Sequence, residues 1–518
     1  MAILTKRKTK RGSGSWTVIE PLPMFRGTTR QVCGIWPFAA GVGAPRRGVP
    51  AGKHLTNNVA VAADPITYFT NGLTSNPSMW IQGKPGLGKS TLGCRIIIGL
   101  EAFGINTLVL GDLKPDYVDT LRAVGGQVIT IGRGRNHLNI LDHSYADDAA
   151  RECELVSVTS LDGKTSWHEY HFLLSNDVRG QLLADAHGRR KGGVLSLINV
   201  MRRAPAGERE SQILDRAITE LENTWHGPAH MVVGDLLNVI DGRPVLRQGG
   251  ELDGQPFPTL GIPTSVRSAA MDNGKQRRYL KATDGLRGSL QALAAGDEFG
   301  GVFSQRSEVQ MDMNRSVGFD VSSIPDTEMD MQSAALLACW NLGFGQVETQ
   351  QVRADNGVIK RKNYLTVMDE LWRPLQAGHG MVDRVAASTR LNRTQGVGLL
   401  YITHTLGDLD LGVSESDRAK AQGIAERCGC HIYFGLPRGE MPKIQRIMPL
   451  TVAEQEMLIN WSTPESWDSD SGEKQDPPGL GYCLIKVSGR VGIPIHVALT
   501  SIEKRLHDTN ARWEEKRR

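Results

Sequence analysis

Residues 83–90 constrain the fold of this chain more than any other stretch, because they match the pattern G-x-x-x-x-G-K-[ST]. Glycines in such a loop let the backbone curl until its N–H groups point at a polyphosphate. Lys89 supplies a positive charge for the β- and γ-phosphates, and the Ser90 hydroxyl can ligate Mg²⁺. The residues predicted to surround the phosphates are Gly83, Lys84, Pro85, Gly86, Leu87, Gly88, Lys89, Ser90 and Thr91.

The flanking residues support this interpretation. The short apolar run 78–81 predicts a strand before the loop, and residues 91–100 predict a helix after it. The positive end of that helix dipole favours a bound anion. A strand, a phosphate loop and a helix in this order predict a nucleotide site that uses ATP and magnesium.

Composition narrows the class of protein. A chain of 518 residues with 40% hydrophobic and 22% charged residues predicts a soluble globular protein of one large domain or a few domains. Its net charge of +4 is too small to indicate nucleic-acid binding by itself. Seven scattered cysteines without ligand spacing argue against a zinc site or a disulfide framework. No apolar run reaches the ~18 residues that span a bilayer, so we expect a cytoplasmic protein without a transmembrane segment.

Strands and helices alternate after the phosphate loop. Residues 106–112 and 127–131 predict buried strands, residues 117–124 a helix between them, and residues 138–142 a further strand. This alternation predicts an α/β fold with a mainly parallel central sheet flanked by helices. The sheet pattern then stops until residue 316, and residues 143–315 predict an inserted, largely helical subdomain with a long irregular loop. Its expected helices cover residues 178–186, 194–201 and 213–225.

The first part of the insertion, residues 170–225, is locally basic. The residues that make it so are Arg179, Arg189, Arg190, Lys191, Arg202 and Arg203. Two interpretations stay open: polar faces of surface helices, or a basic face that contacts DNA or a partner.

A second stretch with candidate catalytic and metal-binding residues lies at residues 363–370. An apolar strand there ends on Asp369 and Glu370. A phosphate-loop ATPase needs a first acid that holds magnesium through water and a second that orients or deprotonates the attacking water. We therefore predict these two roles for Asp369 and Glu370.

The next segment carries arginines and a histidine. Residues 384–393 predict a helix that leads into a strand over residues 396–405. His404 either senses the γ-phosphate or the attacking water, or is a hydrogen-bonded residue at a strand end. Arg390 and Arg393 either complete a neighbouring subunit's site as arginine fingers or are surface charges.

The patterns in the rest of the chain complete a division of the whole sequence into five parts. Residues 451–454 form a capping box that starts a helix, residues 482–487 and 493–500 predict a hairpin, and residues 502–513 predict a last helix. The first fifteen residues predict a disordered basic arm. The parts are a basic, Gly/Pro-rich arm and lead-in (1–50), the first half of the ATPase core (51–142), the insertion (143–315), the second half of the core (316–450), and a C-terminal helix, hairpin and tail (451–518).

Together these motifs resemble the VirB/TraC-type ATPases of conjugative type IV secretion, in the HerA/FtsK superfamily. The resemblance spans roughly residues 35–450 and is carried by the phosphate loop, residues 110–117, 125–129, 138–142, 317–321, 368–372 and 402–408. It implies a RecA-like core, a hexameric ring with sites between subunits, and docking at a membrane-embedded secretion channel on the inner face of the cell membrane. The family usually has glutamine where His404 stands, and glutamate near residues 114–116.

Three hypotheses follow for function. The first is an ATP-hydrolysing motor that energises conjugative transfer of DNA or a relaxase–DNA substrate. The second is a DNA-translocating or coupling ATPase of the same superfamily. The third is a scaffold that assembles on binding ATP and turns over little, a hypothesis that the His404 substitution keeps open.

Overall fold

The chain divides into two compact units, Met1–Gly43 and Ala44–Arg518. The computed structural model describes residues 5–7, 15–17, 45–159, 166–224, 230–241, 273–295, 299–307, 309–371, 373, 392–393, 395–409, 415–467 and 474–506. In the first unit, strand β1 (Thr5–Arg7) pairs antiparallel with β2 (Ser15–Thr17). This ladder corrects the expectation of a wholly disordered arm, and its threonines and tryptophan are residues that favour strands.

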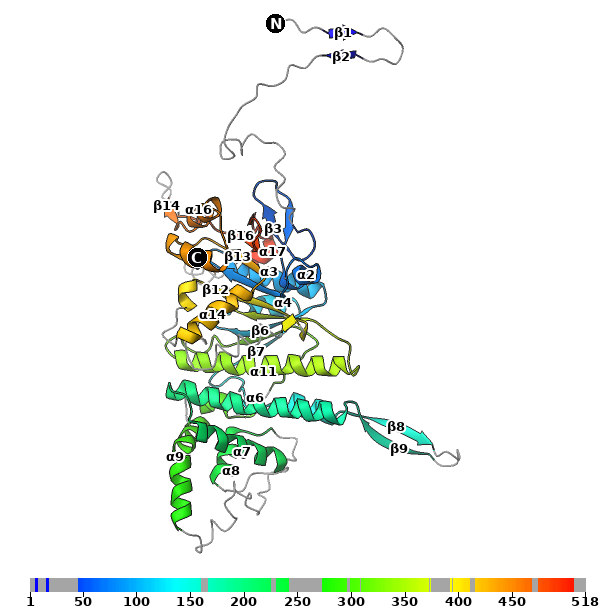
Figure 1. Cartoon of the computed structure of the whole chain (residues 1–518), viewed down its shortest axis with the longest axis vertical. Coiled ribbons are helices and arrows are strands. Elements are labelled where there is room, and N and C mark those ends of the chain that lie inside the picture. The colour runs from blue at the N-terminus through cyan, green and yellow to red at the C-terminus, as the bar shows by residue number, and fades with distance from the viewer. Residues whose placement is uncertain are drawn as a thin grey trace. The chain divides into compact units, whose positions relative to one another are not determined.

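A single sheet forms the centre of the larger unit (Figure 1). Its eleven described strands follow the order β4-β3-β17-β16-β13-β5-β12-β11-β6-β10-β7. The run from β13 to β7 is parallel throughout, whereas the four strands beyond β13 pair antiparallel. The predicted α/β fold with a mainly parallel sheet is confirmed. The strands are β3 (Pro50–His54), β4 (Ala60–Ala62), β5 (Ser78–Gln82), β6 (Asn106–Asp112), β7 (Gln127–Thr130), β10 (Val317–Asp320), β11 (Tyr364–Met368), β12 (Val397–Thr403), β13 (Cys430–Tyr433), β16 (Tyr482–Val487) and β17 (Ile493–His496).

Helices cover both faces of this sheet, as a parallel sheet requires. Along β5, Met79 and Ile81 face one apolar core and Trp80 faces the other. The first core is closed by α2 (Pro65–Thr70), α3 (Lys89–Ala102) and α4 (Val118–Ala123). The second is closed by α11 (Met329–Asp355), which continues well beyond its expected end at Trp340, and by α16 (Val452–Asn460).

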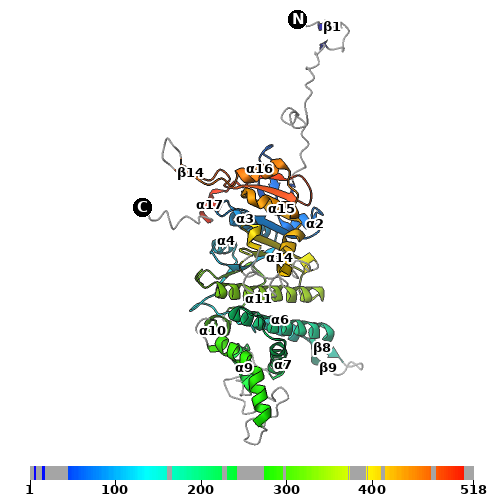
Figure 2. The same ribbon diagram turned by 60° about the vertical axis from the view of Figure 1, so that its left-hand side comes forward.

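The segment between β7 and β10 is mostly helical. Helix α6 packs along α11, and α7, α8 and α9 lie beyond it (Figures 1 and 2). Helix α6 joins two helices that we expected to be separate. Gly193 inside it lies so close to Ile140 on the neighbouring segment that a side chain there would clash. The elements are α5 (Ser144–Arg151), β8 (Cys153–Thr159), β9 (Ser166–Phe172), α6 (Asn176–Arg202), α7 (Glu208–Thr224), α8 (Val233–Asp241), α9 (Asn273–Ala295) and α10 (Gly300–Phe303).

Two further expectations differ from the structure. Residues 138–142 form no strand; the Leu138 amide instead donates to the carbonyl oxygen of Val302 at 2.8 Å. The sequence analysis missed the antiparallel pair β8–β9, although its two segments of alternating polar and apolar residues flank Asp162-Gly163, a dipeptide typical of hairpin turns. None of the helices in the described ranges has the length and apolarity needed to cross a membrane.

The C-terminal segment belongs to the core sheet, since β16 and β17 extend it beyond β13. Arg95 on α3 connects this edge to the phosphate-loop helix. Its Nε and Nη2 donate to the Glu503 carboxylate on α17 (Ser501–Leu506) at 2.6 and 2.7 Å, and its Nη1 donates to the Ala51 carbonyl at 3.0 Å. Burial would raise the pKa of Glu503, but Arg95 and the groups of Thr500 outweigh it and lower this pKa to about 2.

We predict that Arg95→Met lowers the free energy of unfolding by about 3 kcal/mol at pH 7, because it leaves a largely buried carboxylate without its cation. The pKa of Glu503 is lowered in the folded state, so the pair stabilises above the unfolded pKa near 4.5 and loses its effect as pH falls towards 2. The difference between parent and variant in urea denaturation should therefore shrink over that range.

The exposed pair Arg122–Asp119 supplies the control, since its side chains are 64% and 66% exposed. Arg122→Met should change stability by less than about 0.5 kcal/mol. A difference for Arg95→Met that stayed constant from pH 7 to pH 2 would contradict the assignment to the ion pair.

Candidate nucleotide site

The phosphate loop leaves the carboxyl end of β5 and turns directly into α3. Gly88 adopts a left-handed φ of 103°, which a side chain would strain. Helix α3 begins at Lys89, two residues before the expected start, so Lys89 and Ser90 lie in its first turn. Helix N-termini hold unsatisfied N–H groups and favour anions.

The loop fits a polyphosphate. Within the described chain, the amides of Gly86, Leu87 and Gly88 donate to no protein acceptor, so their N–H groups are available to phosphate oxygens. Lys89 is buried, and its Nζ donates to the carbonyl oxygen of Lys84 at 3.0 Å. Burial lowers the pKa of Lys89 to about 8, which still leaves the amine mostly protonated at pH 7.

Asp369 and Glu370 lie at the same end of the sheet as the phosphate loop, where the carboxyl ends of the parallel strands meet. Strand β11 is two strands from β5 in the sheet, and Asp369 follows its last residue. Asp369 Oδ2 accepts a hydrogen bond from the Tyr117 hydroxyl at 2.7 Å and lies 3.5 Å from Ser90 Oγ. Burial, followed by the charge of Glu370, raises the pKa of Asp369 to about 6, so this carboxylate is ionised at pH 7.

These groups suit magnesium. Among the described residues, no cluster of three or more His, Cys, Asp or Glu could hold a metal on its own. Mg²⁺ needs no such cluster, because it is usually held by one or two protein oxygens together with substrate phosphates and water. The Ser90 hydroxyl and the Asp369 carboxylate are such oxygens, and bound magnesium would neutralise charge on the phosphates.

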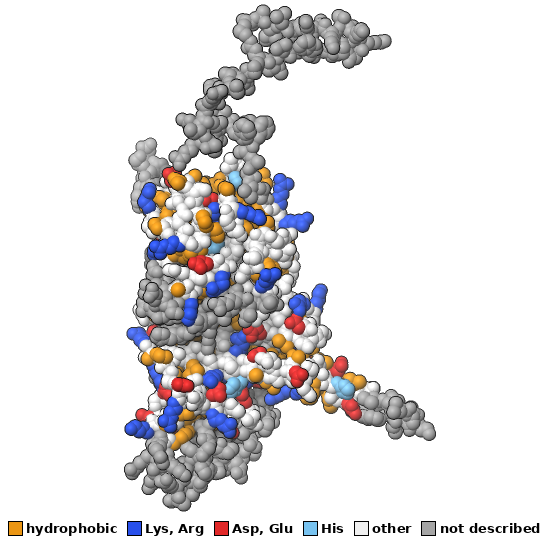
Figure 3. Space-filling view, viewed as in Figure 1, with side chains coloured by type: hydrophobic (Ala, Val, Ile, Leu, Met, Phe, Trp, Pro, Cys, Tyr) orange, Lys and Arg blue, Asp and Glu red, His pale blue; other side chains and the backbone are white. Residues whose placement is uncertain are grey.

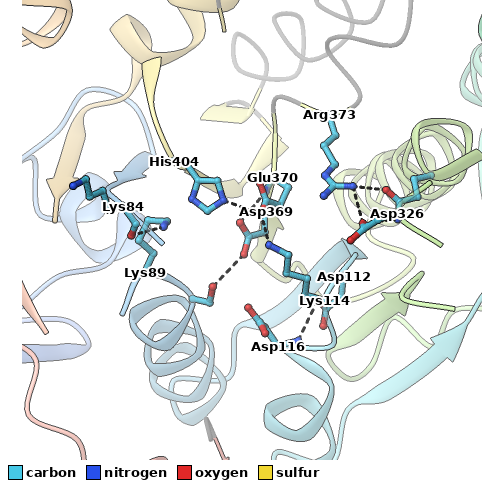
Figure 4. Close-up of polar contacts among 12 residues, drawn as sticks. Lys84, Lys89, Asp112, Lys114, Asp116, Asp326, Asp369, Glu370, Arg373 and His404 are labelled. Carbon is cyan, nitrogen blue, oxygen red and sulfur yellow. Dashed lines mark hydrogen bonds and ion pairs between the residues drawn. The ribbon is translucent and has the colours of Figure 1, made fainter. Parts of the chain in front are cut away.

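Glu370 is held in an unusual conformation. Its φ is +50°, which a residue with a side chain rarely adopts, and only 8% of the residue is exposed. Its Oε1 accepts hydrogen bonds from Lys114 Nζ at 3.2 Å and from His404 Nε2 at 3.1 Å (Figure 4). Backbone strain of this kind persists where the surroundings fix a residue, and it is frequent at functional sites. His404 thus contacts the second acid of the pair.

Three functional candidates escaped the sequence analysis. Lys114, Asp116 and Tyr117 follow Asp112, the last residue of β6, whose carboxylate accepts the amides of Tyr117 at 2.8 Å and Asp116 at 3.3 Å. These bonds turn the chain so that Lys114 reaches Glu370 and Tyr117 reaches Asp369. Burial raises the pKa of Asp116, while the Ser90 hydroxyl and Lys114 lower it. The sequence did hold a signal for them: Asp112 ends a strand four residues before Asp116-Tyr117.

The arginines do not join this group of residues. Arg390 lies outside the described residues. Arg393 is exposed, with its guanidinium carbon 5.7 Å from the centre of the Phe69 ring. It precedes β12, whose far end at Thr403 leads to His404, so it lies at the opposite edge of the sheet from the phosphate loop. A role for either arginine in a neighbouring subunit's site stays a prediction.

The fold matches that of a solved structure, VirB4. VirB4 of Thermoanaerobacter pseudethanolicus superposes with a TM-score of 0.60 over 90% of this chain and 100% of that one, at 15% sequence identity. The predicted resemblance to VirB-type ATPases is confirmed at the level of the RecA-like fold. Plasmid coupling protein TrwB, solved with ADP and Mg²⁺, is similar at a TM-score of 0.42 and 11% identity over 89% of this chain and 96% of that one, which is too weak to carry an argument. No protein-family model and no curated protein sequence matches the chain.

We predict that Tyr117→Phe raises the magnesium concentration needed for half-maximal ATP binding by about tenfold, as expected when a group that orients a metal ligand is lost. The physical reason is the hydrogen bond from the Tyr117 hydroxyl to Asp369, which holds the carboxylate in place and keeps it ionised. Titration of ATP binding against magnesium at pH 7 measures the effect.

Tyr170→Phe is the matched control, because Tyr170 is 75% exposed on the β9 strand. Its magnesium curve should superpose on that of the parent. If Tyr117→Phe also superposed on the parent, the Tyr117 hydroxyl would have no part in metal binding.

Proposed function

We propose that this protein is a magnesium-dependent ATPase that converts ATP and water to ADP and phosphate, and that it acts as a motor in conjugative transfer or type IV secretion. The observation that carries the proposal is the meeting of four groups at one edge of the sheet. Lys89 and Ser90 begin the helix after the phosphate loop, and Asp369 and Glu370 directly follow strand β11, which lies two positions from β5 in the sheet. The match of the whole fold to VirB4 supports the secretion role.

Each residue has a proposed task. The loop amides and Lys89 bind the phosphates, Ser90 and Asp369 ligate magnesium, and Glu370 accepts the proton of the attacking water. Lys114 and His404 both donate to Oε1 of Glu370, so both contact the proposed general base directly. His404 then acts by orienting Glu370, and any contact with the γ-phosphate is secondary.

Completion of the site by a second subunit is also proposed. Arg393 lies before the first residue of β12, away from its own chain's phosphate loop, so we propose that it serves a neighbour. The same role is proposed for Arg390. Such a role requires a ring, for which we propose six copies docked at a membrane-embedded secretion channel on the cytoplasmic side. DNA or a relaxase–DNA complex is the proposed cargo.

A DNA-translocating ATPase is the second candidate, but the basic residues of the insertion do not favour it. Of the six basic residues named for residues 170–225, five form ion pairs within the chain, and the guanidinium of the sixth, Arg179, lies over the Phe172 ring at 3.4 Å. On the face drawn in Figure 3, basic and acidic side chains are mixed. The pairs are Arg189–Glu348, Arg190–Glu222, Lys191–Asp215, Arg202–Glu210 and Arg203–Asp330.

Steady-state ATP hydrolysis tests the proposal at several protein concentrations, with and without single- and double-stranded DNA. We expect turnover that rises with protein concentration and does not respond to DNA. Lys89→Ala should abolish it, and Glu370→Gln should lower kcat by at least about 100-fold while ATP still binds, since only the general base is lost.

The outcomes separate the candidate functions. Strong stimulation by DNA would favour the translocase. Unchanged turnover and assembly in Glu370→Gln would show that Glu370 is not catalytic and would favour the scaffold. Arg122→Gln, a change on the exposed side of α4, should match the parent in every assay.

A further inference from the structure

Three aromatic rings from the C-terminal segment form a stack. Trp461 follows α16, Tyr482 is the first residue of β16, and His496 is the last residue of β17. The ring centres of Trp461 and Tyr482 lie 6.0 Å apart, and those of Tyr482 and His496 lie 4.6 Å apart. All three residues are only partly buried, so part of each side chain remains accessible.

The strand directions place this stack at the end of the sheet where the carboxyl ends of the parallel strands lie, which is the end that carries the phosphate loop. Strand β16 is antiparallel to β13 and β17 is antiparallel to β16, so β17 runs in the same direction as β13 and β5. His496 therefore ends its strand on the same edge as Gln82 ends β5. Tyr482, directly opposite His496 in the ladder, lies on that edge as well.

Direct contacts connect the stack to the loop. The Gly481 amide donates to the carbonyl oxygen of Leu87 at 3.1 Å, and the Gly481 carbonyl accepts the Val497 amide at 2.8 Å. Gly481 has a φ of +75°, which favours glycine, and its Cα lies beside the His496 ring. On the other side, Lys84 Nζ donates to the carbonyl oxygen of Ser462, next to Trp461, at 2.9 Å.

We propose that Trp461, Tyr482 and His496 form the wall on which the base of the bound nucleotide stacks. This inference rests on the proposed phosphate site, because the base is tethered to the phosphates through the ribose and must lie beside the loop. The two sides of the loop differ in chemistry: β11, which leads to Asp369 and Glu370, lies on one side of β5 in the sheet, and β16 and β17, which carry Tyr482 and His496, lie on the other. A flat, weakly polar base suits the aromatic side.

Stacking also predicts low selectivity among bases. Every base has a π-face, so aromatic platforms bind different bases with similar strength. The wall should therefore accept ATP and GTP alike, and the segment 461–496 acts in nucleotide binding as well as in closing the sheet edge.

Equilibrium binding of Mg-ATP and of magnesium tripolyphosphate, which has no base, tests the wall. Tyr482→Ala should weaken Mg-ATP binding about 5- to 100-fold, the range typical of losing one stacked base, and leave tripolyphosphate binding unchanged. Tyr482→Phe keeps the ring and should bind both ligands as the parent does. Equal losses for both ligands, or no loss for either, would overturn the proposal.

Lys89→Ala tests the underlying phosphate site separately. It should weaken both ligands, and if it weakens neither, the proposed function fails irrespective of the wall. Photocrosslinking of the parent chain with 8-azidoadenosine triphosphate avoids any substitution. Labelling of Trp461, Tyr482 or His496 supports the wall, and labelling confined to other segments overturns it.

Discussion

The site depends on keeping the Asp369 carboxylate ionised while it is buried. A buried charge is costly unless hydrogen bonds replace the lost water. Tyr117 and the backbone amide of Glu370 donate to its two oxygens at 2.7 and 2.8 Å, and the Ser90 hydroxyl lies 3.5 Å away. These donors come from segments far apart in the chain, so the carboxylate is stabilised only when β5, β11 and β6 have assembled in order. The site therefore exists only in the folded sheet.

Local patterns predicted the parts of the site that local geometry determines. Glycine spacing and a following apolar helix give the phosphate loop, and an apolar strand that ends on two acids gives Asp369 and Glu370. The sequence could not reveal that Lys114 and His404 meet on one oxygen of Glu370. That meeting requires β6 and β12 to flank β11, and strand order depends on long-range pairing that no short motif encodes.

The charges of the insertion are a second case in which the sequence alone does not reveal which residues meet. Composition identified a basic section, but charge counts do not say where the compensating acids lie. Arg190 is 3% exposed and is held between Asp147 and Glu222, which come from α5 and α7. A guanidinium that deeply buried requires such partners. The basic section is thus part of how α6 packs on its neighbours, a fact visible only after the helices are placed.

The C-terminal segment supplies the antiparallel strands β16 and β17, which cover the side of β13. Without β16 and β17, the edge of β13 would expose unpaired backbone groups beside the phosphate loop. The segment that covers this edge also bonds the loop directly at Leu87 and Lys84. A ligand that binds the ordered loop therefore binds a state in which the edge is closed, and by mass action it stabilises that closed edge. The proposed binding of a nucleotide and the packing of the C-terminal segment are thus thermodynamically linked, although they involve residues about 400 positions apart in the chain.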